Sequence, residues 1–165
     1  MTYIFQVAKS EDVEPVFSLY KKRVHWMNKS GIHQWNDQDY LSVYPMAYFE
    51  KQQKLGNLYV LKDRECIIGA VVILQRDDRW LDRDDFSAYY IHNLVTDPAI
   101  KGIGKTILIE AEQLAIRHGK HFIRLDCAVD NAFLNEYYSS LGYELAGYCV
   151  DGSYKGNRRE KTLAS

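Results

Sequence analysis

Residues 99–106, Ala-Ile-Lys-Gly-Ile-Gly-Lys-Thr, have the composition of a phosphate-binding turn. Gly102 and Gly104 stand directly before an amphipathic stretch, and glycine lets the main chain come close to a ligand. Main-chain N–H groups at the start of a helix bind phosphate, and the helix dipole assists them. Lys101 adds a positive charge nearby. The turn is therefore predicted to hold a phosphate-bearing ligand.

The same turn nearly matches the nucleotide-binding pattern G-x-x-x-x-G-K-[S/T], with Ala99 in place of the first glycine. Residues 122–126, Phe-Ile-Arg-Leu-Asp, could then be the strand whose final aspartate holds magnesium. Two features count against this alternative. Such proteins usually begin their fold with this motif, whereas about 95 residues precede it here, and Arg124 interrupts the apolar strand. Lys105 can equally be an exposed lysine of a helix.

Hydrophobic periodicity predicts the elements that must position this turn. Strands are predicted at residues 3–8, 58–62, 66–74, 86–96, 122–128, 143–150 and 154–163. Helices are predicted from Ser10 toward Gly31 and at residues 46–54, 102–118 and 132–140. Short turns at residues 63–65 and 151–152 predict two hairpins, and Gly69 predicts a bulge.

The order β-α-α-β-β-β-α-β-α-β-β predicts an α/β (α+β) fold in which helices flank a mixed, mostly antiparallel sheet. Strands 86–96 and 122–128, which a helix separates, are predicted to be the central parallel pair. The glycine turn then follows the C-terminal end of the first of these strands, where open α/β sheets bind ligands.

Composition narrows the possible functions. A chain of 165 residues fits a single domain, which we expect to span residues 1–165. The net charge of −1 lacks the basic footprint of a nucleic-acid binder. Cys66, Cys127 and Cys149 have no metal-ligand spacing, so we expect buried thiols of a reducing compartment and no metal. Without a signal peptide or a membrane span, a cytoplasmic protein with no membrane partner is expected.

Two stretches carry a resemblance to a known family. The first is Leu94-Val95-Thr96-Asp97-Pro98 followed by Ala99-Ile100-Lys101-Gly102-Ile103-Gly104, which is similar to L-x-V-x-P and then Q/R-x-x-G-x-G/A, with departures at Thr96 and Ala99. The second contains Arg124-Leu125-Asp126, Asn131, Tyr138 and Gly142-Tyr143. Both resemble the GNAT superfamily of acetyl-CoA-dependent N-acetyltransferases. Gly31-Ile32-His33-Gln34-Trp35 and Tyr90-Ile91-His92-Asn93-Leu94 are similar to elements of its small bacterial members.

The resemblance implies the GNAT acyl-CoA N-acyltransferase fold, whose central parallel pair is splayed. It implies transfer of an acetyl group from acetyl-CoA to a primary amine of a small molecule by direct attack in a ternary complex, by a monomer or homodimer. Main-chain groups at the splayed strand would pair with pantetheine, and the glycine turn would hold the pyrophosphate. The implied coenzyme-binding residues are Leu94, Val95, Thr96, Ile100, Lys101, Gly102, Ile103, Gly104, Lys105, Thr106, Asn131 and Tyr138.

The resemblance also implies two catalytic residues. Tyr138 lies where many members place a tyrosine near the coenzyme sulfur, and it could protonate the leaving thiolate; it could equally be a core aromatic of its helix. His92 lies where relatives often carry a glutamate that deprotonates the amine, and imidazole can serve near neutral pH. The alternatives are a hydrogen-bonded sheet histidine and proton loss to solvent. Asn131 could contact the coenzyme or only cap the helix of Tyr138.

The substrate pocket is expected between the N-terminal helices and a charged connector at residues 76–85. The connector is either a solvated loop or a rim that attracts cations, such as a polyamine, an amino sugar or an amino acid derivative. The candidate wall residues are Trp26, His33, Gln34, Trp35, Trp80 and Asp82. Aromatic residues are as often core as pocket. Two other functions stay open: a P-loop nucleotide hydrolase, and an acyl-CoA-binding module without turnover.

Overall fold

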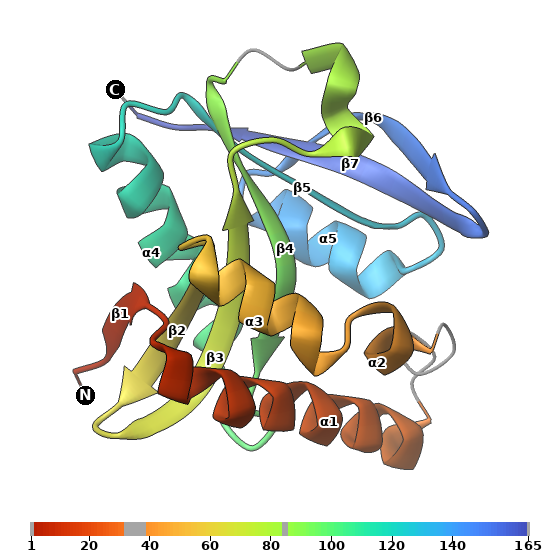
Figure 1. Ribbon diagram of the computed structural model, residues 1–165. Coiled ribbons are helices and arrows are strands. Elements are labelled where there is room, and N and C mark those ends of the chain that lie inside the picture. Colours follow the sequence, from red (N-terminus) through yellow and green to blue (C-terminus); the bar gives the residue numbers. More distant parts are fainter. Residues whose placement is uncertain (1, 32–38, 84–85, 165) are drawn as a thin grey trace. The chain divides into compact units, whose positions relative to one another are not determined.

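The computed structural model describes residues 2–31, 39–83 and 86–164 (Figure 1). Hydrogen bonding orders the strands β1-β2-β3-β4-β5-β7-β6. The chain forms two compact units, Met1–Val72 with Asn93–Glu110, and Ile73–His92 with Ala111–Ser165. We call them the first and second unit. The expectation that residues 1–165 form a single domain stays a prediction.

The first unit contains an antiparallel ladder of β1 (Ile4–Val7), β2 (Leu58–Asp63) and β3 (Cys66–Leu74), of which β3 runs on into the second unit. The β2–β3 hairpin turns at Arg64, which adopts a left-handed φ of 58°. Its register steps from Leu61 opposite Gly69 to Lys62 opposite Ile67, which leaves Ile68 as the extra residue. The predicted hairpin is confirmed, and the predicted bulge lies one residue from Gly69. Cys66 is exposed and not buried as expected, because it lies at the first position of β3, next to the hairpin turn.

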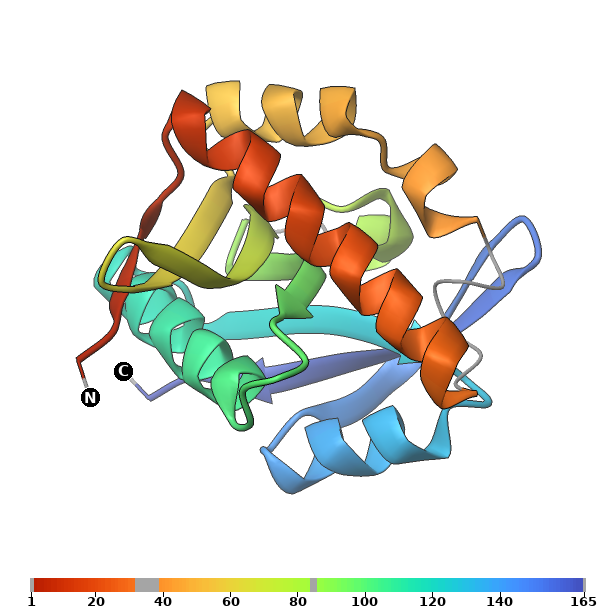
Figure 2. The ribbon, with the colours of Figure 1, turned by 90° about the horizontal axis from the view of Figure 1, so that it is seen from below.

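Helices α1 (Val13–Ser30) and α3 (Met46–Lys54) pack side by side in the first unit (Figures 1 and 2). Tyr20 of α1 stacks on Phe49 of α3 with ring centroids 4.5 Å apart, and both side chains are fully buried. The short helix α2 (Tyr40–Val43) adds Tyr40, which stacks on Tyr20 at 5.9 Å. The periodic apolar face of α1 thus becomes an aromatic core, and Gly31 ends the helix with a φ of 71°.

Helix α4 (Ile103–Arg117) begins in the first unit and comes very close to β3 there. A Cβ atom at Gly69 would lie 2.5 Å from Cδ1 of Ile107 and 3.1 Å from Cγ2 of Ile103. Both isoleucines are buried. Gly69 is therefore required for the packing of the helix against the strand, in addition to its place beside the bulge.

The second unit contains the parallel pair. Residues Ala88–Tyr90 of β4 (Ala88–Thr96) pair with the first three residues of β5 (Phe122–Ala128). The parallel ladder ends there, whereas β5 pairs antiparallel along its whole length with β7 (Tyr154–Thr162). Strand β6 (Glu144–Asp151) completes the hairpin that Asp151-Gly152 predicted, and α5 (Ala132–Ser140) packs on β5 and β6 (Figure 2). The predicted fold class is confirmed.

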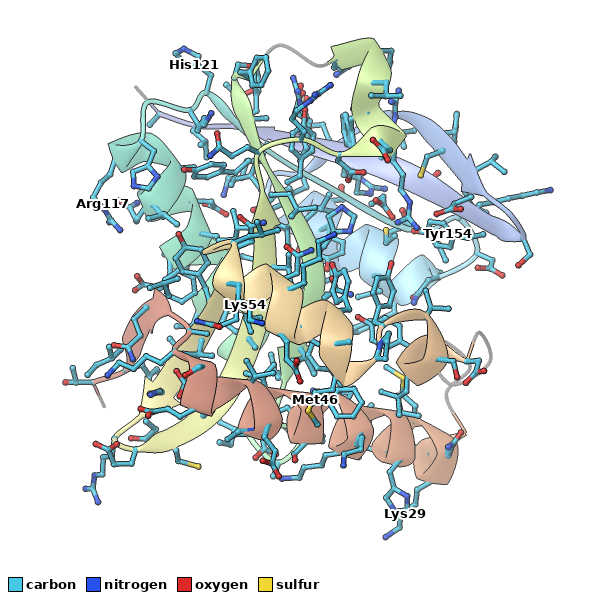
Figure 3. The ribbon with its side chains drawn as sticks, viewed as in Figure 1. Lys29, Met46, Lys54, Arg117, His121 and Tyr154 are labelled. Atoms are coloured by element: carbon cyan, nitrogen blue, oxygen red, sulfur yellow. The ribbon has the colours of Figure 1, made fainter. Side chains whose placement is uncertain are left out.

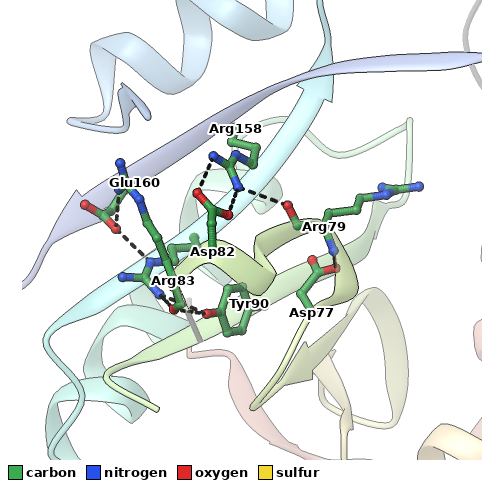
Figure 4. A network of polar contacts seen from close by, with 8 residues as sticks. Asp77, Arg79, Asp82, Arg83, Tyr90, Arg158 and Glu160 are labelled. Atoms are coloured by element: carbon green, nitrogen blue, oxygen red, sulfur yellow. Dashed lines mark hydrogen bonds and ion pairs between the residues drawn. The ribbon is translucent and has the colours of Figure 1, made fainter. Parts of the chain in front are cut away.

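The charged connector forms a 3₁₀ helix, η3 (Asp78–Arg83), whose centre is apolar. Trp80 is fully buried and clusters with Ala88 and Tyr90. Ion pairs hold the two sides of η3, as Figure 4 shows for Asp82 with Arg158 and for Arg83 with Glu160. The connector is therefore fixed to the core of the second unit and is not a freely solvated loop. None of the helices in the described ranges is long and apolar enough to cross a membrane.

Candidate active site

Asp97 shapes the glycine turn of the first unit. Its carboxylate accepts the main-chain N–H of Ala99 at 3.0 Å, and its main-chain carbonyl accepts that of Ile100 at 3.1 Å. Lys22 forms an ion pair with the same carboxylate at 2.9 Å. Burial acts to raise the pKa of Asp97, but these bonds and the charges of Lys22 and Arg23 outweigh it and leave the pKa below its usual value. The Asp-Pro pair, a known turn signal, could have indicated this role.

The start of α4 leaves several main-chain N–H groups outside the helical ladder. The first bond of the ladder runs from the N–H of Thr106 to the carbonyl of Gly102 at 3.3 Å, so the N–H groups of residues 102–105 precede it. Gly102 has a φ of 83°, and a Cβ there would have no atom within 4 Å. Lys101 and Lys105 are exposed. This end of α4 suits an anion such as a pyrophosphate.

One N–H group proposed for the pyrophosphate is already engaged. The N–H of Ile100 donates to the carbonyl of Asp97 within the turn, and the N–H of Thr106, another implied coenzyme-binding residue, donates within the helix. Ile103 is buried, and Gly104 is half-buried in the first turn of the helix. The available N–H groups therefore centre on Gly102 and the first turn of α4.

The strand edge expected to bind pantetheine is partly occupied as well. The guanidinium of Arg23 donates to the carbonyl of Thr96 at 2.8 Å and to its hydroxyl at 2.5 Å. Val95 is buried, and Leu94 is half-buried. The carbonyl of Thr96, one of the main-chain groups expected to pair with pantetheine, therefore already accepts a hydrogen bond from α1. Arg23 also lies 4.8 Å above the ring of Trp26, a predicted pocket residue that is 37% exposed.

Asn93 interrupts β4 with a left-handed φ of 55°, an uncommon conformation for a residue with a side chain. Three tyrosines hold it. Tyr20 donates to its carbonyl, Tyr48 donates to Oδ1 at 2.8 Å, and its Nδ2 donates to the hydroxyl of Tyr40 at 2.5 Å. No local pattern in the sequence indicates this arrangement, which fixes the backbone of β4 directly before Leu94.

In the second unit, His92 is paired with an aspartate. Its Nε2 lies 2.5 Å from the carboxylate of Asp77, and the two side chains are 15% and 7% exposed. Polar atoms of Asp77, His92 and Asp126 all lie within 4.8 Å of one another. Asp126 accepts from Arg79 at 3.1 Å and from the hydroxyl of Tyr154 at 2.6 Å, and Figure 3 shows Tyr154 at the start of β7. The sequence indicated His92 but not these partners.

Tyr138 lies in α5 of the second unit and is buried. Its ring meets that of Tyr143 edge to face, with centroids 5.9 Å apart. Burial, and then the nearby Cys127, Tyr137 and Asp126, raise the pKa of Tyr138 well above its usual value. Its hydroxyl therefore stays protonated at neutral pH.

Asn131 caps the same helix, because its side-chain oxygen accepts the N–H of Leu134 at 3.0 Å. The capping role considered from the sequence is thus present.

The remaining predicted pocket residues lie in different environments or outside the described part of the chain. Trp80 is fully buried in the core of the second unit, which is the environment of a packing residue. Asp82 makes two bonds to Arg158, at 2.5 and 3.0 Å, and this hydrogen-bonded pair lowers the pKa of Asp82. His33, Gln34 and Trp35 lie outside the described residues.

A sequence profile described as the acetyltransferase (GNAT) family matches residues 22–143, well over half of the chain. The chain belongs to the GNAT family of acetyltransferases. It is 30% identical over 159 residues to the uncharacterized N-acetyltransferase YesJ of Bacillus subtilis (strain 168), a match that covers 86% of this chain and 82% of YesJ. This GNAT protein is accordingly an acyltransferase, and its family accounts for the glycine turn without a nucleotide-hydrolase fold.

Solved structures agree with that membership. A GNAT family acetyltransferase from Listeria monocytogenes has a TM-score of 0.82 and 26% identity, over 98% of this chain and 95% of the other. The PaiA N-acetyltransferase of Thermoplasma acidophilum, solved in complex with coenzyme A, has a TM-score of 0.76 and 18% identity, over 99% and 100% of the two chains. The second likeness shows a common fold.

Proposed function

We propose that this GNAT enzyme transfers the acetyl group of acetyl-CoA to a primary amine of a small, cationic molecule by direct attack in a ternary complex. The observation that carries the proposal is the start of α4, where the N–H groups of residues 102–105 precede the helical ladder. Such groups suit the coenzyme pyrophosphate, and the exposed Lys101 and Lys105 add positive charge. PaiA, a protein of the same fold, was solved in complex with coenzyme A, which supports coenzyme A as the ligand.

Other residues are also proposed to contact the coenzyme, with allowance for the hydrogen bonds that their groups already make. Leu94 and Val95 would offer main-chain groups to pantetheine, and Thr96 would contribute through its N–H, because its carbonyl is bonded to Arg23. Asn131 would act by capping the helix that carries Tyr138, since its side-chain oxygen is already bonded. Acetyl-CoA supplies the activated acetyl group as a thioester.

Two side chains would carry the proton transfers. His92 would accept a proton from the acceptor ammonium, which leaves a neutral amine able to attack. Tyr138, whose hydroxyl is protonated at neutral pH, would give a proton to the departing thiolate. Burial raises the pKa of Cys127 to about 11, so this thiol is a poor nucleophile and direct attack needs no covalent cysteine.

The acceptor class follows from the charges around His92. Asp77 and Asp126, whose side chains are 7% and 6% exposed, lie beside it, and Arg79 is the guanidinium that Asp126 and the exposed Asp151 share. Carboxylates therefore outnumber the cations among these groups. This surplus favours an acceptor that arrives as an ammonium ion, such as a polyamine, an amino sugar or an amino acid derivative.

The first experiment measures coenzyme binding and turnover. We expect calorimetry to detect acetyl-CoA binding, and incubation with a panel of primary amines to release free thiol with at least one of them. ATP and GTP with magnesium serve as the comparison ligands. Nucleotide binding that is lost in Lys105→Ala, without any binding of acetyl-CoA, would favour the P-loop alternative and reject the proposal.

The second experiment tests the chemical roles. His92→Ala and Tyr138→Phe are each expected to lower kcat by about 10²- to 10⁴-fold, the usual contribution of a proton-transfer group. Tyr137→Phe is the matched control, because Tyr137 is the half-buried neighbour of Tyr138 on the same helix. If neither catalytic variant changes the rate, both assignments are wrong. Coenzyme binding without turnover would indicate a non-catalytic binding module.

A further inference from the structure

The carboxylate of Asp77 is held from both sides. One oxygen lies 2.5 Å from Nε2 of His92, and the other accepts the main-chain N–H of Arg79 at 2.9 Å, which Figure 4 shows. The carbonyl of Asp77 accepts the N–H of Trp80 at 2.9 Å, and Trp80 is anchored in the core of the second unit. Asp77 is therefore fixed by main-chain contacts that do not involve His92.

The ionisation of Asp77 determines which ring nitrogen of His92 carries hydrogen. Burial acts to raise the pKa of Asp77, but the hydrogen bond and charge of His92, with the N–H and guanidinium of Arg79, outweigh it and leave the pKa below its usual value. An ionised carboxylate can only accept hydrogen bonds. Nε2 of His92 must therefore carry hydrogen, and in the neutral ring Nδ1 holds the free lone pair.

We propose that Asp77 is a positioning residue for His92. It orients the imidazole, holds the tautomer whose Nδ1 can accept a proton, and stabilises the imidazolium once that proton has arrived. This inference rests on the proposed function, in which His92 is the base. In the step concerned, an N–H bond of the acceptor ammonium breaks, its electron pair stays on the amine nitrogen, and the proton forms a bond with Nδ1.

Other charged and titratable groups surround the pair. Asp126 of β5 has a carboxylate oxygen within 4.8 Å of one ring nitrogen of His92 and one carboxylate oxygen of Asp77. Arg79 bonds Asp126 at 3.1 Å and Asp151 of β6 at 3.1 Å. Tyr154 of β7 donates to Asp126, and Cys149 of β6 lies within electrostatic range of Asp77, Asp126 and Arg79. Among these groups, Asp77 is the one with a hydrogen bond to His92. Removal of its carboxylate should therefore affect the imidazole of His92 most directly.

The experiment compares Asp77→Asn with Asp78→Asn, the exposed neighbouring aspartate, as matched control. An asparagine amide can donate to Nε2, which moves the ring hydrogen to Nδ1 and blocks the base. We expect Asp77→Asn to lower kcat by about 10- to 100-fold with little change in the KM for acetyl-CoA. Asp77→Glu, which keeps the carboxylate, should recover part of the rate.

A spectroscopic readout separates this inference from the proposed function. Nitrogen-15 NMR of the imidazole, assigned by comparison with His92→Gln, is expected to show Nε2–H in the wild-type protein and a changed tautomer in Asp77→Asn. This holds even for a protein that transfers no acetyl group. A wild-type ring with hydrogen on Nδ1, or an unchanged His92 signal in folded Asp77→Asn, overturns the role of Asp77. Loss of activity in His92→Ala with no effect of Asp77→Asn on the rate or the spectrum also overturns it.

Discussion

At the scale of single residues, Asn93 connects the aromatic core of the first unit to the strand that is proposed to bind coenzyme. Its left-handed backbone places it between Tyr20, Tyr40 and Tyr48, and each tyrosine hydroxyl takes part in a bond to it. A residue held in an unusual conformation by several bonds often marks a functional position. Here the position lies between His92 and Leu94, which have different proposed roles.

Replacement of Asn93 should separate its backbone effect from its side-chain effect. Asn93→Ala loses the bonds to Tyr40 and Tyr48 and must hold a left-handed conformation, so we expect the free energy of unfolding to fall by about 2–4 kcal/mol. Asn93→Gly loses the same side-chain bonds but tolerates the conformation, and should lose less. Urea unfolding measures both. Equal losses would show that the backbone conformation carries no cost.

At the scale of elements, the contact of α4 with β3 depends on the missing side chain of Gly69. The helix can lie this close because the strand has no Cβ at the contact, where Ile103 and Ile107 fill the space. The carbonyl of Ile68, the extra residue of the bulge, accepts the N–H of Asp97 at 2.9 Å. The bulge therefore helps to hold the residue that shapes the glycine turn.

Gly69→Ala is expected to destabilise the protein by about 1–3 kcal/mol, because the new methyl group would overlap Cδ1 of the buried Ile107. Ile107→Val removes that atom and alone should cost about 0.5–1.5 kcal/mol. In the double variant the loss should be smaller than the sum of the two single losses. Thermal and urea unfolding of the three variants test this coupling. Additive losses would contradict the packing explanation.

At the scale of the whole molecule, acidic side chains in both units are held in their ionised form. Asp97 in the first unit and Asp77 and Asp82 in the second have pKa values below the usual value. Burial acts to raise the pKa of Asp97 and of Asp77, but hydrogen bonds and charges of neighbouring groups lower it by more. For Asp82 the bond to Arg158 is the largest cause.

Stability should fall in acid. Each of these carboxyls binds a proton more readily in the unfolded chain, at a pKa of about 3.9, than in the native protein. Their contribution is therefore complete above about pH 5, and it is lost as the pH falls through the unfolded and then the native pKa values. Urea midpoints at about pH 6.5, 4.5 and 3.5 should decrease in that order. Asp97→Asn should reduce the decrease, and an unchanged pH dependence in that variant would contradict its part in the effect.

The sequence by itself determined the order of the strands and of helices α1, α3, α4 and α5, both hairpins, the parallel pair and the glycine turn at the start of α4. Helix α2 and the 3₁₀ helix η3 were not predicted. The predicted features follow from local rules: apolar spacing, glycines that end helices or form turns, and the short or long connections between strands. The family motifs are equally local, so they indicated a GNAT protein, and the sequence profile confirms this. Local sequence is therefore enough to indicate His92 and Tyr138 as candidate catalytic residues and the turn as a candidate coenzyme site.

Only the tertiary structure decided which distant side chains meet these candidates. Asp77 stands 15 residues before His92, and the bond from Tyr20 to Asn93 spans 73 residues. The same holds for Trp80, which lies within a charged segment and yet is fully buried, and for Thr96, whose carbonyl receives Arg23 from α1. Hydrogen bonds, burial and shifted pKa values depend on three-dimensional neighbours, and the local pattern of residues does not specify them.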